Sequence, residues 1–211
     1  MKKLKVILTA VAVAFSTSVF AQNLNFGLKA GLNLSSATIK IDGEKSDEIK
    51  MLPGLVVGAF SDINFTEKFG LETGLQFEQK GYKAEEEIYG KTATDKFTVN
   101  YLTVPVNLRL NLPVGENNLY FLAGPTFGIG LSAKEKVEYD GETETESIDF
   151  GDDGGLSRMN IGLLFGAGYE LSGKLGLRVT YDLGLSNLVS DGDSDNKVST
   201  NVLGLSITYK F

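Results

Sequence analysis

The last fourteen residues of the chain, 198–211, alternate between apolar and polar side chains. One face carries the following apolar side chains: Phe211, Tyr209, Ile207, Leu205 and Leu203. The other face carries Lys210, Thr208, Ser206 and Gly204. A period of two is the pattern of a β-strand with one apolar face. The segment therefore predicts a strand that turns one side toward a non-aqueous medium.

The same alternation recurs in seven earlier segments, which makes eight in all. Each is at least as long as the roughly 9 to 11 residues that a tilted strand needs to cross a bilayer. The earlier segments are 24–34, 55–65, 69–77, 102–110, 119–131, 161–171 and 175–185. Outside the N-terminus, no apolar run approaches the roughly 18 residues of a membrane-spanning helix.

The charged residues of these strands decide which side faces which medium. They all fall on the face opposite the apolar one, together with most strand glycines, and five are basic and five acidic: Lys29, Asp62, Glu72, Glu78, Lys80, Arg109, Glu170, Arg178, Asp182 and Lys210. A soluble barrel that binds ligands, such as a lipocalin, needs apolar side chains within and polar ones outside. A lysine or arginine at mid-height on the lipid face of a membrane barrel costs about 2–4 kcal/mol. The apolar face is therefore expected to contact lipid.

These observations predict an all-β fold, namely an eight-stranded antiparallel closed transmembrane β-barrel with up-and-down (meander) connections. Eight strands enclose only enough room for their own side chains. We therefore expect the ten charged side chains to pair inside the barrel as a lumen charge network, with glycines making room for the long ones, and we do not expect an open pore.

The connections between the segments alternate in length. Four are long and polar, namely 36–51, 83–96, 133–158 and 189–197, whereas those at 66–68, 111–117 and 172–174 are short. Outer-membrane barrels have short periplasmic turns and longer extracellular loops. Both termini are therefore expected in the periplasm. Pro105 and Pro125 fall inside strands, where a closed ladder tolerates proline poorly, and we interpret them as local bulges.

The N-terminus predicts export. Lys2, Lys3 and Lys5 precede an apolar core over 6–20, and Val19-Phe20-Ala21 is a small-x-small cleavage site before Gln22. A membrane anchor is disfavoured because the segment is short and a processing site follows it. Residues 1–21 are therefore expected to be a cleaved signal peptide and 22–211 the barrel domain. Loss of three lysines changes the formal charge from -7 to -10.

The whole mature chain resembles the outer-membrane protein β-barrel domain family (PorT-like, "porin family" proteins). More distantly, the chain is similar to the eight-stranded barrels of the OmpA and OmpX type. The resemblance lies in 26–33, 70–77 with Lys80-Gly81, 101–106, 122–125 and 209–211. It implies a barrel in the bacterial outer membrane, surrounded by lipid. Phe211 resembles the signal by which the barrel-assembly machinery recognises its clients. Some PorT-like members act in protein secretion, and these scaffold motifs do not extend that role to this chain.

Candidate catalytic chemistry is sparse. The chain has no His and no Cys, so it cannot form the Ser-His-acid arrangement of acyl-transfer enzymes. Glu72 and Asp182, near arginines, are conceivable as an acid/base pair. An interior salt-bridge plug accounts for them better, because all ten strand charges share one face and balance in sign. We therefore expect no enzymatic activity and no cofactor. No Gly-rich phosphate loop and no basic patch indicates nucleic acid.

The long connections are acidic, and 135–153 is the richest of them. Its carboxylates are Glu135, Glu138, Asp140, Glu142, Glu144, Glu146, Asp149, Asp152 and Asp153. We expect a solvated, mobile loop, and the functional alternative is binding of divalent cations or of a basic extracellular partner. Residues 191–196 resemble the start of an EF-hand loop, but Asn196 and Val202 stand where Gly and Glu are required.

The sequence thus predicts a non-enzymatic outer-membrane protein with a plugged, charge-balanced lumen and acidic extracellular loops. Its role would be structural, or it would present its loops to partners. The alternative is a narrow porin-like channel for small solutes or ions. A lipid-modifying enzyme is a third class, which labelled-lipid turnover dependent on Glu72 or Asp182 would revive.

Overall fold

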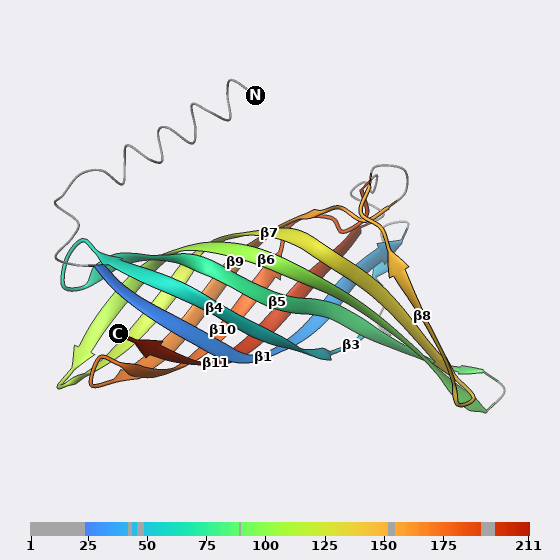
Figure 1. The fold of residues 1–211 in the computed structure, drawn as a ribbon, viewed down its shortest axis with the longest axis horizontal. Helices are drawn as coiled ribbons and strands as arrows, with labels where there is room; N and C mark the ends of the chain where they lie inside the picture. Colours follow the sequence, from blue (N-terminus) through green and yellow to red (C-terminus); the bar gives the residue numbers. More distant parts are fainter. Residues whose placement is uncertain (1–23, 42–43, 46–48, 89, 152–154, 191–196) are drawn as a thin grey trace, which may run out of the picture.

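A computed structural model shows eight long antiparallel strands arranged in a ring (Figure 1). They are β1 (Leu24–Ile41), β4 (Leu52–Asn64), β5 (Phe69–Ile88), β6 (Lys91–Val114), β7 (Asn117–Tyr139), β9 (Met159–Leu171), β10 (Leu175–Gly184) and β11 (Lys197–Lys210). The structure describes residues 24–41, 44–45, 49–88, 90–151, 155–190 and 197–211. The expected signal peptide, with its cleavage site between Ala21 and Gln22, lies outside these residues. Among them, no helix is long and apolar enough to cross a membrane.

The ring closes through β1 and β11. Each long strand pairs with the next along the chain, and β1 pairs with β11 from Gly27↔Lys210 to Lys40↔Lys197. The backbone N–H of Phe211 also donates to the carbonyl of Phe26 at 3.0 Å. Because the ladder has no free edge around the ring, backbone groups need no hydrogen bonds from the surrounding medium. The predicted eight-stranded antiparallel closed barrel is confirmed.

The two faces of the strands divide as the alternation predicts. Apolar side chains point outward, as the 59% exposure of Ile207 illustrates, whereas the side chains on the opposite parity are buried, as for Arg178 at 1%. In an ordinary soluble domain the exposed and the buried sides would be the reverse. The barrel therefore has a lipid-facing exterior and a polar interior.

Two lumen glycines make room for aromatic rings on the neighbouring strand. Gly168 lies opposite Tyr120, and a Cβ at this glycine would lie 2.3 Å from the Tyr120 ring. Gly27 lies opposite Phe60, whose ring would be 2.5 Å from an added Cβ. Such distances are far below van der Waals contact, so any larger residue at either glycine would displace the ring.

The interpretation of the two prolines as bulges is wrong. Opposite Pro105, pairing stops after Thr73↔Val106 and resumes at Gln76↔Thr103 without a change of register. Proline has no N–H to donate, so the ladder opens for two residues and closes again. The Thr73 hydroxyl donates to the Pro105 carbonyl at 2.9 Å across this gap.

Pairing opposite Pro125 is interrupted in the same way, between Pro105↔Thr126 and Leu108↔Ala123. Among the described strands, the register shift lies instead between Asn100 and Tyr101. The proline positions therefore leave the alternation of faces unchanged on both sides.

Two of the expected loops are mostly strand. β5 and β6 continue almost to a turn near Gly90, and β7 pairs with a further strand, β8 (Glu142–Ile148). With the short β3 (Ile49–Lys50) on the other side, these strands form a sheet that extends beyond the ring at lower right in Figure 1. We call it the protruding sheet. A second short strand, β2 (Glu44–Lys45), pairs with β1.

The expectation that 135–153 is a solvated loop is wrong for the residues that form the end of β7 and the whole of β8. Ion pairs between neighbouring strands, such as Lys96 with Glu138 at 3.2 Å, compensate the charges there. Asp152, Asp153 and the EF-hand-like segment 191–196 lie outside the described residues.

The outward face of β10 allows a direct test of the lipid-facing assignment. We predict that Val179→Arg lowers the free energy of unfolding by about 2–4 kcal/mol, because the cation would be placed in hydrocarbon. Val137→Arg, the same change in the protruding sheet, should cost less than 1 kcal/mol. Denaturant unfolding in lipid vesicles measures both, and equal costs would contradict the assignment.

Candidate functional site

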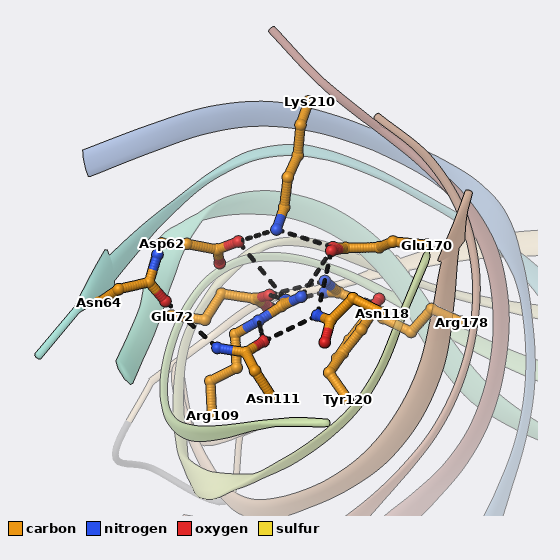
Figure 2. Close-up of polar contacts among 10 residues, drawn as sticks. All are labelled: Asp62, Asn64, Glu72, Arg109, Asn111, Asn118, Tyr120, Glu170, Arg178 and Lys210. Carbon is orange, nitrogen blue, oxygen red and sulfur yellow. Dashed lines mark hydrogen bonds and ion pairs between the residues drawn. The ribbon is translucent and has the colours of Figure 1, made fainter. Parts of the chain in front are cut away.

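The buried charges form two clusters inside the barrel. We call the one nearer the short turns the lower cluster, and Figure 2 shows it. Its charged members come from six of the eight strands: Asp62 (β4), Glu72 (β5), Arg109 (β6), Glu170 (β9), Arg178 (β10) and Lys210 (β11). Three are acidic and three basic, so the cluster has no net charge.

One contact in the lower cluster, an ion pair with two hydrogen bonds, joins opposite sides of the barrel. Arg178 binds Glu72 through two hydrogen bonds, from Nη1 to Oε1 at 2.7 Å and from Nη2 to Oε2 at 2.6 Å. The third donor, Nε, binds the hydroxyl oxygen of Tyr120 at 2.9 Å. Three strands separate β5 from β10 in either direction around the ring, so this pair spans the lumen.

Arg109 joins the remaining carboxylates to this pair. Its guanidinium donates to Glu72 at 3.1 Å and to Glu170 at 2.7 Å, and its Nε donates to Asn111 at 2.8 Å. The guanidinium also lies 3.7 Å from the centroid of the Tyr120 ring, a cation–π contact. The planar, five-donor guanidinium suits such multiple contacts better than an ammonium would.

Lys210 completes the lower cluster from the last strand. Its ammonium lies 2.5 Å from Asp62 and 2.8 Å from Glu170, between the two carboxylates in Figure 2. Amide side chains border the cluster, and Asn111 accepts a hydrogen bond from Asn118 at 2.9 Å. Each cation thus has carboxylate partners where water is largely excluded.

The upper cluster lies farther along the same strands. Lys80 on β5 contacts Glu78 at 3.0 Å and, across the lumen, Asp182 on β10 at 2.8 Å. Neutral groups satisfy further atoms: Asn160 accepts from Lys80 at 3.1 Å and Thr103 donates to Glu78 at 2.7 Å. As in the lower cluster, a direct ion pair joins β5 to β10.

Lys29 differs from the other nine charged residues. Its side chain is 8% exposed, and it has no ion pair or hydrogen bond to any of the described residues. It lines a cavity of about 20 Å³, together with residues of both clusters such as Arg178 and Asp182. Three amide atoms of residues lining the same cavity have no hydrogen-bond partner among the described residues: Asn33 Nδ2, Gln76 Oε1 and Asn107 Oδ1.

An apolar cluster, which we call the cap, lies at the end of the barrel that carries the protruding sheet. It consists of Phe97, Val99, Tyr101, Ala133 and Leu188, with Tyr82, Ile148, Phe150, Leu156 and Val198 packed against them. Phe150 and Leu156 lie between β8 and β9 in the sequence, and both pack against this cluster. A Cβ at Gly130 would lie 2.5 Å from the Phe150 ring, so this glycine permits the contact.

All ten charged residues named from the sequence are buried in the structure. Nine make ion pairs with one another, and Lys29 does not. Glu72 and Asp182, considered above as an acid/base pair, bind cations in different clusters. The alternation placed the charges inside, but neutral partners such as Tyr120 and Asn160 have no distinguishing pattern in the sequence.

The protruding sheet carries different charges on its two faces, which the pairing register defines. On what we call the acidic face lie Glu86, Asp95, Glu135, Glu142, Glu144 and Glu146. Burial raises the pKa of both Asp95 and Glu135, and repulsion by Asp95 and Glu146 raises that of Glu135 further. Among the described residues, no cluster of three or more Asp or Glu side chains is close enough to hold a metal ion.

Comparison with known proteins gives one family and several solved structures. Residues 20–190 match the family model described as outer membrane protein beta-barrel domain. A comparison with curated protein sequences gives no match. The chain is similar to Ail, the attachment invasion locus protein of Yersinia pestis, solved with the heparin analogue sucrose octasulfate, at 19% identity over 90% of this chain and 99% of that one, with a TM-score of 0.41.

Two further solved structures are similar at lower identity. Neisserial surface protein A matches 88% of this chain and 97% of its own, with 13% identity and a TM-score of 0.47. OprG from Pseudomonas aeruginosa matches 89% of this chain and 95% of its own, with 15% identity and a TM-score of 0.42.

The contact between Glu72 and Arg178 can be measured by a double-mutant cycle. We predict that Glu72→Gln and Arg178→Gln each lower the unfolding free energy by about 3–5 kcal/mol, because each leaves a buried charge without its partner. The double variant should cost clearly less than the two single costs combined. Lys29→Gln serves as the control and should cost less than Arg178→Gln. Additive costs in vesicle unfolding would show that the pair is not coupled.

Proposed function

Because this chain belongs to the outer membrane protein β-barrel domain family and lies in the bacterial outer membrane, we propose that it is a non-enzymatic envelope protein with a plugged lumen. We further propose that it presents the protruding sheet to extracellular partners. The observation that carries the first part is the pair of direct ion contacts between β5 and β10, at two heights in the lumen.

The proposal of a plugged lumen is supported by the ion pairs that a solute would have to break in order to pass. In the lower cluster, one ion pair crosses the lumen between β5 and β10, and others link β4 to β11 and β6 to β9. Separating a buried, hydrogen-bonded ion pair costs about 3–5 kcal/mol when one partner is left uncompensated. The upper cluster and the cap add two further obstructions along the axis. A permeating ion would have to break several such contacts in succession.

The proposed orientation follows from the lengths of the connections at the two ends of the barrel. The short turns and Phe211 lie at the same end of the barrel, at left in Figure 1, and the protruding sheet lies at the other end. Since short turns are periplasmic in barrels of this kind, the protruding sheet would be extracellular. Both chain termini would lie in the periplasm, and Phe211 would be accessible there to the barrel-assembly machinery during insertion.

The acidic face supports a basic extracellular partner. Glu142, Glu144 and Glu146 project from β8, whose residues are almost all exposed. The second edge of β8 has no strand partner among the described residues, so its backbone N–H and C=O groups are open to hydrogen bonding. A basic, extended segment would satisfy both the carboxylates and this edge. Binding of a divalent cation at these carboxylates is the other proposal from the sequence.

Lys29 favours one alternative, a narrow channel for small solutes or ions. Its ammonium has no described ion-pair partner and reaches the cavity between the two clusters. A small anion that entered the lumen would find this ammonium without a direct ion-pair partner. The channel would nevertheless require the crossing contacts above and below the cavity to open.

Planar-bilayer recording distinguishes the plug from the channel. We expect no conductance steps from the wild-type protein, whose insertion is verified by heat-modifiable migration. The variant Glu72→Ala/Arg178→Ala, which lacks the lower crossing contact, should conduct intermittently. Steady steps from the wild type that change when Arg109 or Glu72 is neutralised would overturn the plug.

Partner binding can be tested with a decalysine peptide and protein in zwitterionic nanodiscs. We predict that Glu142→Gln/Glu144→Gln/Glu146→Gln weakens peptide binding about tenfold, since exposed ion pairs contribute about 0.5 kcal/mol each. The matched control is Glu67→Gln/Glu87→Gln/Glu116→Gln, which removes three exposed carboxylates that lie outside the acidic face. Calorimetry that gives equal losses for both variants would contradict the assignment to the acidic face.

A further inference from the structure

The face of the protruding sheet opposite the acidic one carries a row of lysines. We call it the basic face. Lys50 pairs with Lys83, Lys83 with Lys96, and Lys96 with Lys136, so four lysines lie side by side on β3, β5, β6 and β7. Like charges directly opposite each other destabilise a sheet. The row therefore opposes the stability of the sheet unless anions compensate it.

The described residues supply part of this compensation, and they do so from one side of the row. Glu85 forms ion pairs with Lys50 and Lys83, and Glu138 does so with Lys96 and Lys136. The hydrogen bonds from the two lysines hold the pKa of Glu85 down to about 2, so this carboxylate is ionised at neutral pH. Both glutamates stand one row farther from the barrel than the lysines.

Among the described residues of these strands, no carboxylate stands on the other side of the row, between the lysines and the barrel. The residues that follow there on the same face are Gly81, Thr98 and Lys134, and then Gln79, Asn100 and Ser132. Among the described residues, the basic face thus holds five lysines against three glutamates, Glu85, Glu87 and Glu138. Its lysines are closest to the barrel and its glutamates are farthest away.

The basic face continues the lipid-facing surface of the barrel. Phe77, Leu102 and Ile129 lie side by side on the outer surface, and Leu131, 54% exposed, ends the apolar series on β7. Lys134 and Lys136 follow Leu131 by three and five residues, which places them roughly 7 and 12 Å beyond it along the membrane normal for a strand tilted by about 45°. Lysine side chains commonly extend along the surface toward an interface. The ammonium groups therefore reach the depth of lipid headgroups.

We propose that the basic face binds phosphate groups of anionic lipid headgroups in the leaflet next to it. Charge complementarity and position support this choice of ligand: the uncompensated side of the lysine row faces the membrane, and the face is continuous with the apolar band. The acidic face of the same sheet would be turned away from these headgroups. Headgroup binding would fix the tilt of the protruding sheet relative to the membrane. This proposal of headgroup binding does not depend on whether the acidic face binds a partner.

Residue-specific labelling of lysines by an amine-reactive reagent tests this proposal on the wild-type protein. The protein is placed in nanodiscs of zwitterionic phosphatidylcholine, or in nanodiscs that also contain phosphatidic acid. We expect labelling of Lys83, Lys96 and Lys136 to slow about fivefold with phosphatidic acid, the factor that corresponds to about 1 kcal/mol per lysine at an anionic surface. Lys91 pairs with Asp140 near the tip of the sheet and serves as the internal control, whose rate should not change.

Two further arms identify the source of the anion. Inorganic phosphate or dextran sulfate, added to zwitterionic nanodiscs at the same anion concentration, should protect the three lysines less than phosphatidic acid does. Equal rates in the two nanodiscs, equal slowing of Lys91, or equal protection by either soluble anion would each overturn the proposal.

In the variant Lys83→Gln/Lys96→Gln/Lys136→Gln, phosphatidic acid retained after detergent extraction should fall severalfold. In the control Lys68→Gln/Lys91→Gln/Lys174→Gln it should fall less, and an equal fall would also contradict the proposal.

Discussion

Hydrocarbon offers no hydrogen bonds and no counter-charge, and the organisation of this barrel follows from that constraint. A chain that crosses a bilayer as strands must pair all of its backbone groups with itself, which requires a closed ring. It must also remove every charge from the outer face. The pairing of β1 with β11 meets the first requirement, and the burial of all ten strand charges meets the second. The lumen charge network is therefore a consequence of the same constraint as the apolar exterior.

An eight-stranded ring leaves little space for these charges, and this accounts for much of the interior. Glycines at 27 and 168 admit the rings of Phe60 and Tyr120, and Tyr120 in turn contacts both lower-cluster arginines. The two arginines distribute their donors over Glu72 and Glu170, with neutral oxygens as additional acceptors. A buried network of this kind is stable only when nearly every member has a partner. Among the ten charged residues, Lys29 is the exception, because it has no described partner, and it lies beside a cavity.

The fold was predictable because period-two alternation is a physical requirement of a strand between two media. The same pattern assigned Lys29 and Arg178 to the interior face, and both side chains are buried in the structure. It could not reveal which cation binds which carboxylate, because such contacts depend on positions across the lumen. The alternation of apolar and polar residues also failed to predict the strands beyond the membrane. Both faces of those strands meet water, so most of their residues are polar or charged. There, 83–96 and much of 133–158 appeared to be loops, although Phe97, Val99 and Val137 alternate with polar residues. The proline interpretation failed for a different reason, since the ladder accommodates a missing donor by a short gap without an extra residue.

The central claim is that odd-numbered residues of β10 face lipid and even-numbered residues face a closed, polar lumen. The chain contains no cysteine, so a single introduced cysteine at each position from 175 to 184 can carry one spin label. Power saturation of these labels in lipid vesicles measures their accessibility to oxygen, which concentrates in hydrocarbon, and to a water-soluble nickel chelate. The account predicts high oxygen accessibility at odd positions and low accessibility to both reagents at even positions. Nickel accessibility at the odd positions, or at the even positions in mid-strand, would contradict it.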